Sequence, residues 1–78
     1  MSHFYFDIRD GESLLVDEEG LDLTNQRAAE IEAALSLADM AEQLETFASV
    51  DGLTVEVRDA DGPILKATFV YSKVHPIN

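Results

Sequence analysis

Carboxylates are the side chains of this sequence best suited to chemistry, because several of their oxygens together bind hard cations such as calcium and magnesium. Two acidic clusters offer such oxygens: Asp17, Glu18, Glu19 and Asp22, and separately Asp59 and Asp61. The second cluster matches only the start of an EF-hand loop and lacks its closing Glu, which favours an ordinary hairpin turn ending at Gly62. The first cluster is interpreted as a solvated acidic turn. We therefore expect no metal and no cofactor, with a divalent cation at either cluster as the alternative.

Nucleophilic catalysis has no recognisable set of residues in this sequence. A hydrolase triad needs a nucleophile, a base and an orienting acid, and none of the serines stands in a nucleophile-elbow context. His3 and His75 lie near opposite ends of the chain and are interpreted as separate surface side chains. The four glycines occur singly, which is unlike a phosphate-binding loop, and the chain has no cysteine. The sequence predicts that the protein is not an enzyme and has no catalytic residues.

Net charge limits the classes of partner. Sixteen Asp and Glu residues against five Lys and Arg residues give a formal net charge of -11. Binding to nucleic acid or to an anionic membrane surface draws on Lys and Arg, so we expect neither as a direct partner. The first residues carry no basic segment of a secretory signal, and no apolar run is long enough to span a membrane. The sequence predicts a cytoplasmic protein whose partner is another protein or a second copy of itself.

Residue patterns place two β-hairpins around one helix. Apolar and polar residues alternate from His3 to Arg9, and Asp10-Gly11 predicts a turn, which together indicate a hairpin over about residues 3–17. Residues 25–47 lack Gly and Pro and are rich in Ala, which predicts a helix capped by Thr24 or Asn25. A second hairpin is expected over about residues 53–74, with its turn at 59–62. The segment 21–23 either extends the first hairpin or packs beneath the helix.

The order of these elements predicts a single α+β domain over residues 1–78. Its architecture is a two-layer ββαββ arrangement, in which one amphipathic helix packs on one face of a four-stranded, mainly antiparallel sheet. The strand order 2-1-3-4 is favoured, and 2-1-4-3, in which the first and fourth strands pair in parallel, is the alternative.

Helical periodicity predicts which residues form the core. The helix is expected to contact the sheet mainly through Leu37, Met40, Leu44 and Phe47. The facing residues of the sheet are expected to be Phe4, Phe6, Ile8, Val55, Val57 and Phe69. The opposite face of the helix is expected to be polar, with Glu32, Ser36, Asp39 and Gln43. Ile31 and Leu35 fall at the flank of the buried stripe.

One helix covers only one side of such a sheet, so the other side is predicted to meet water or a partner. The candidate partner surface on that side comprises Tyr5, Asp7, Arg9, Glu56, Arg58, Lys66, Thr68 and Val70. Arg9 and Arg58 are expected to pair with Asp7 and Glu56 across strands. Thr54 is expected on the same side.

The absence of recognisable catalytic motifs favours a small acidic, non-enzymatic protein-interaction or regulatory module. It is expected to bind a protein or to form a homodimer through the uncovered sheet face or an edge strand. The alternative is an acidic mimic or antitoxin-like inhibitor that occupies the surface of a basic, nucleic-acid-binding partner. A carboxylate-based divalent-metal site is a more distant alternative.

Four segments in order carry a resemblance that covers nearly the whole chain: Phe4 to Gly11, Asp17 to Leu21, the Ala-rich helix with Leu37 to Ala41, and Val55 to Asp59 before Asp61-Gly62. The sequence resembles a short bacterial domain of unknown function from rhizobia and other alphaproteobacteria, which opens with an aromatic-Phe-Asp-x-x-Asp-Gly motif. This resemblance implies no catalytic residue. Thr24-Asn25 departs from the Pro-Asp expected before the helix. A weaker similarity, to antitoxin domains of the HicB type, serves only as an analogy.

Overall fold

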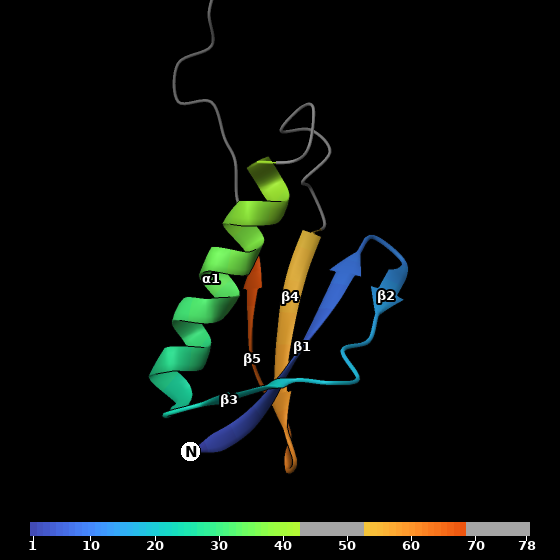
Figure 1. Ribbon diagram of the computed structural model, residues 1–78. Helices are drawn as coiled ribbons and strands as arrows, with labels where there is room; N and C mark the ends of the chain where they lie inside the picture. The colour runs from blue at the N-terminus through green and yellow to red at the C-terminus, as the bar shows by residue number, and fades with distance from the viewer. Residues whose placement is uncertain (43–52, 69–78) are drawn as a thin grey trace, which may run out of the picture.

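The computed structural model describes residues 1–42 and 53–68 of the chain (Figure 1). Its elements in order are β1 (Ser2–Asp10), β2 (Ser13–Leu15), β3 (Leu21–Leu23), α1 (Gln26–Glu42), β4 (Leu53–Asp59) and β5 (Gly62–Thr68). The α+β class is confirmed, but the prediction of four strands was one too few. The missing strand is β3, whose residues the sequence assigned either to an extension of the first hairpin or to a segment beneath the helix, and which instead pairs with the beginning of β1.

The sheet has the order β2-β1-β4-β5, and all of its paired strands are antiparallel. This is the favoured order of the two that the sequence allowed. The long strand β1 is paired with β4 along one side, and its other side is shared by two short strands. β2 pairs with the end of β1, where Ile8 faces Leu15, and β3 pairs with its beginning, where Phe4 faces Leu21.

Local side-chain chemistry sets where several elements begin and turn. Asn25 caps α1, because its Oδ1 accepts a hydrogen bond of 3.0 Å from the backbone N–H of Ala28. Gly11 and Gly62 occupy the hairpin turns with φ angles of 62° and 126°, which favour glycine. The predicted helix residues 43–47 and strand residues 69–74 lie outside the described part of the chain.

The core lies between α1 and the central strands. Phe4, Val55 and Val57 are buried on the sheet, as predicted, together with Leu53. The buried residues of the helix are Ala29, Ala33, Leu37 and Ala41, while Met40 is partly buried against this cluster. Leu44, Phe47 and Phe69 lie outside the described residues. Within the described part, the helix therefore packs mainly through alanines, which allow it to approach the sheet closely.

The opposite face of α1 differs from its prediction. Ile31 and Leu35 are 48% and 62% exposed, whereas Glu32 and Ser36 are partly buried. At 3.6 residues per turn, Ile31 and Leu35 both lie about 160° from Ala33 around the helix, on the side away from the sheet. The expectation that they border the buried stripe was wrong. The stripe of Ala29, Ala33, Leu37 and Ala41 faces the sheet, and Ile31 and Leu35 do not.

The helix covers only part of its sheet face. It packs against β4, β5 and β3, and Figure 1 shows β1 and β2 extending to one side of it. A β-bulge adds Ile64 to β5 between the pairs Val57–Leu65 and Arg58–Pro63, and both Ile64 and Leu65 pack against the core. The helix in the described part is too short and polar to cross a lipid bilayer.

The buried stripe of α1 can be tested with two leucines that differ in exposure. Leu37 is 6% exposed and Leu14 on β2 is 44% exposed. Leu37→Ala should lower the free energy of unfolding by about 2–5 kcal/mol, because it leaves a cavity beneath the helix. Leu14→Ala should lower it by about 0.5 kcal/mol or less. Urea denaturation followed by circular dichroism measures both, and equal losses would contradict the assigned helix face.

Candidate functional site

Two ion pairs cross the sheet face that α1 leaves uncovered. Arg58 Nε lies 2.9 Å from Asp7 Oδ2, and Arg9 Nε lies 2.6 Å from Glu56 Oε2. The predicted pairing of these arginines with these carboxylates across strands is thus confirmed. Each carboxylate raises the pKa of its arginine, and the hydrogen bond from Arg9 lowers the pKa of Glu56. Both arginines and both carboxylates are therefore bound to one another on this face.

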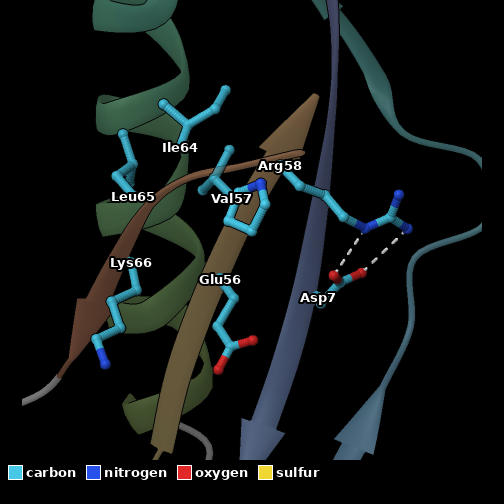
Figure 2. Close-up of a pocket in the computed structure, with 8 residues that line it drawn as sticks. Asp7, Glu56, Val57, Arg58, Ile64, Leu65 and Lys66 are labelled. Carbon is cyan, nitrogen blue, oxygen red and sulfur yellow. Dashed lines mark hydrogen bonds and ion pairs between the residues drawn. The ribbon is translucent and has the colours of Figure 1, made fainter. Parts of the chain in front are cut away.

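A shallow hollow of about 380 Å³ lies on this face at the bulge of β5. Its lining residues, drawn in Figure 2, are Asp7, Glu56, Val57, Arg58, Pro63, Ile64, Leu65 and Lys66. Figure 2 shows the Arg58 guanidinium turned toward Asp7, away from the bulge residues. Two acidic and two basic side chains line the hollow, so it offers a ligand little net charge.

Most of the remaining residues predicted for the partner surface also lie on this face. The guanidinium of Arg58 stacks over the ring of Tyr5, 4.4 Å from its centroid, and the ring of His3 meets Tyr5 edge-on at 5.0 Å. The hydroxyl groups of Thr54 and Thr68 lie 3.3 Å apart. Val70 lies outside the described residues. Tyr5, the aromatic residue expected to attract a partner, is thus partly covered by its own neighbours.

Asp17 organises the segment between β2 and β3, a role that the sequence interpretation missed. Its carboxylate accepts hydrogen bonds of 3.1 Å from the backbone N–H groups of Phe6, Glu19 and Gly20. The Phe6 N–H lies on β1 between the parts paired with β2 and β3, so Asp17 satisfies a donor that neither strand reaches. The signal in the sequence is an Asp three residues before a Gly, which is typical of a side-chain-stabilised turn.

Hydrogen bonding rather than solvation therefore dominates the electrostatics of Asp17. The N–H of Gly20, followed by those of Phe6 and Glu19, lowers the pKa of Asp17 against the opposing effect of burial. The same residue connects to the ion pair on the sheet, since its own N–H donates to Asp7 and its carbonyl accepts from Arg58. The interpretation of the first acidic cluster as a merely solvated turn was therefore wrong for Asp17.

His3 ties β1 to the same segment. Its Nδ1 lies 2.6 Å from Asp22 Oδ1 and its Nε2 lies 2.7 Å from the carbonyl oxygen of Glu19. Because both partners are acceptors, only the doubly protonated ring can donate to both. The hydrogen bond to Asp22 is the main cause that raises the pKa of His3, and the Glu19 carbonyl adds to it. His3 is a surface side chain, as predicted, but its two hydrogen-bond partners were not anticipated. His75 lies outside the described residues.

The close contact of His3 with the segment between β2 and β3 requires a glycine at position 20. Its φ angle is 72°, and a Cβ atom there would lie 2.5 Å from His3 Nε2 and 2.7 Å from the Phe4 carbonyl oxygen. Any other residue would therefore be strained and would also collide with β1.

A groove of about 350 Å³ opens beside β2, on the side of the sheet that α1 covers only in part. Its lining residues are Phe6, Ile8, Leu15, Val16, Asp17, Glu18 and Glu19. Phe6 and Ile8 form an apolar surface continuous with the core, Leu15 and Val16 are exposed, and Glu18 and Glu19 add exposed acidic groups. This apolar groove with an acidic border was not among the predicted sites, because Phe6 and Ile8 were expected to lie beneath the helix.

The described residues of the two acidic clusters are not arranged as the ligands of a metal ion. Among residues 1–42 and 53–68, no three His, Asp or Glu side chains converge as ligands of one ion. In the second cluster, Asp59 Oδ1 accepts a hydrogen bond of 2.8 Å from the N–H of Asp61, which stabilises the turn that the sequence favoured.

The sequence profile of one family, a domain of unknown function (DUF6894), matches residues 3–70. The chain belongs to this family. The match confirms the resemblance to a short domain of unknown function. No curated protein and no solved structure matches the chain.

Two carboxylates of this DUF6894 domain allow a matched test of the ion pairs. Asp7 and Glu56 face each other in the sheet and each binds one arginine, but their side chains are 11% and 33% exposed. Asp7→Ala should lower the free energy of unfolding by about 1–3 kcal/mol, because it removes the acceptor of Arg58 and of the Asp17 N–H. Glu56→Ala should lower the free energy of unfolding by a clearly smaller amount, because the side chain of Glu56 is more exposed to solvent. Urea denaturation compares them, and a larger loss for Glu56→Ala would contradict the assigned network.

The contacts of His3 predict a pH-dependent contribution to the stability of the DUF6894 domain. Because the folded state raises the pKa of His3, its contribution is present in full below the unfolded value of 6.5 and is lost as the pH rises through the folded pKa. The melting temperature of the natural chain should therefore exceed that of His3→Gln at about pH 5, and this difference should shrink toward about pH 9. Thermal melts over this range measure it. A difference that is constant or grows with pH would contradict the paired imidazolium.

Proposed function

We propose that the protein is a small, acidic, non-enzymatic interaction module of the cytoplasm, which binds an extended basic segment of a partner protein in the groove beside β2. The observation that supports this most directly is the groove itself, with apolar residues at its base and acidic residues at its border. Its volume of about 350 Å³ is within the range of small binding sites.

The chemistry of the groove favours one class of partner. Phe6, Ile8 and Leu15 offer apolar surface to side chains that point into the groove. Glu18 and Glu19, together with a net charge of -11 over the chain, favour Lys or Arg on the same segment. An alternating apolar and basic sequence supplies both.

The position of the groove also favours an extended partner. β2 lies at the edge of the sheet, and no strand among residues 1–42 and 53–68 pairs with the outer side of its backbone, where a further strand could add. Strand addition would supply main-chain hydrogen bonds, and the groove would select the side chains. By comparison, the predicted sheet-face surface has its arginines paired and its charges balanced.

Two leucines of β2 provide the test. Leu15 lines the groove, whereas Leu14 faces the other side of the strand, opposite Arg9. We expect Leu15→Glu to weaken binding of a fluorescent peptide of alternating valine and arginine by at least about 10-fold, and Leu14→Glu to leave it within about 2-fold. Both variants add one negative charge, so long-range attraction affects them equally. Fluorescence anisotropy at several salt concentrations measures the affinities.

The same pair of variants applies to natural partners. In affinity capture from source cells, a partner of the groove is retained by the natural chain and by Leu14→Glu and is lost with Leu15→Glu. Equal effects of the two variants, in the peptide assay and in capture, would refute the groove as the binding site. If binding depends steeply on salt but not on Leu15, the acidic-mimic alternative is favoured, because long-range charge attraction is screened by salt.

A further inference from the structure

The outer face of α1 carries an apolar stripe that the fold of the described chain does not use. Ile31 and Leu35 are one helical turn apart and are 48% and 62% exposed. Ala34 and Ala38 are exposed beside them. Small and large apolar residues therefore alternate over two turns of this face, with Arg27 near one end and Glu42 at the other.

We infer that a second copy of this chain binds this stripe, with the two α1 helices packed antiparallel about a two-fold axis midway between Ala34 and Leu35. This arrangement places Ile31 of each copy opposite Ala38 of the other, and Leu35 opposite Ala34. Each large side chain then meets a small one, which lets the helices approach closely. A parallel arrangement in the same register would place Leu35 against Leu35 and alanine against alanine.

Charge favours the same orientation. The antiparallel pair brings Arg27 of each copy opposite Glu42 of the other, whereas a parallel pair would place like charges together. Arg27 is exposed and contacts Glu30 of its own helix through one guanidinium nitrogen, Nη1, at 3.0 Å. Its remaining donors suit a second carboxylate. Antiparallel helices also align their dipoles favourably.

The interface is small, and both copies carry a net charge of -11. A single helix pair lies at the low end of interface sizes, so we expect a dissociation constant on the order of 100 μM. General repulsion between the copies is screened by salt, so the dimer tightens as salt rises. This inference goes beyond the proposed function, because it uses a different surface and does not depend on the groove.

Sedimentation velocity between about 10 μM and about 1 mM, at low and high salt, tests the interface. The natural chain should shift from monomer to dimer over this range. Ile31→Glu combined with Leu35→Glu should weaken dimerisation at least about 10-fold. The control, Leu14→Glu combined with Leu15→Glu, adds the same charge on β2. It should leave the dimer dissociation constant within about 2-fold and weaken peptide binding in the groove by at least about 10-fold.

Orientation is tested by cross-linking, since the chain has no cysteine of its own. A mixture of Ile31→Cys and Ala38→Cys chains should form mixed disulfide dimers several-fold in excess over either homodimer. A parallel pair would give homodimers instead. The inference is overturned by a monomer at the highest concentration and salt, by a dimer that the β2 variant removes and the helix variant does not, or by predominant homodimer cross-links.

Discussion

The carboxylate of Asp7 is the group on which the arrangement of the sheet depends. It lies on the central strand β1 and its side chain is only 11% exposed, so its charge requires partners within the protein. Arg58 on β4 and the backbone N–H of Asp17 supply them. Because these residues lie on two different strands and on the segment after β2, their contacts join β1, β4 and that segment into one network.

The same network explains why two short strands share one side of β1. The chain leaves β1 after Leu15 and returns at Leu21. In between, Asp17 takes the place of a strand by accepting the N–H of Phe6 with its side chain. Its hydrogen bonds to the N–H groups of Glu19 and Gly20 form the turn that directs the chain into β3, and His3 holds that turn against β1.

The position of the helix follows from the size of its contact residues. Ala29, Ala33 and Ala41 occupy most of the described contact face, so α1 lies close to β4 and β5. Close packing over these strands leaves Phe6 and Ile8 at the border of the core, where they line the groove beside β2. It also leaves the larger residues Ile31 and Leu35 on the outer face of the helix. Both the groove beside β2 and the apolar outer face of α1 therefore result from the close packing of the alanine-rich helix face on β4 and β5.

Local pattern in the sequence was sufficient for four of the five strands and for the start of the helix. Alternation identified β1, β4 and β5, single glycines marked the hairpin turns, and Asn25 was one of two expected caps. The cross-strand partners of Arg9 and Arg58 were also predictable, because opposite charges lie on the same face of neighbouring strands, where each arginine reaches a carboxylate diagonally across the pair.

The remaining features depend on contacts that no local pattern specifies. The periodicity of α1 is ambiguous, since Ala, Leu and Ile occur around most of its circumference, and only the close approach of the sheet selects the alanine stripe. β3 is defined by its pairing with the beginning of β1, and the roles of Asp17 and His3 depend on backbone groups brought close by folding. The sequence by itself determined the helix, the two hairpins and the charges they carry. Only the tertiary structure decided which faces meet, because burial and pairing of distant groups outweigh local preference.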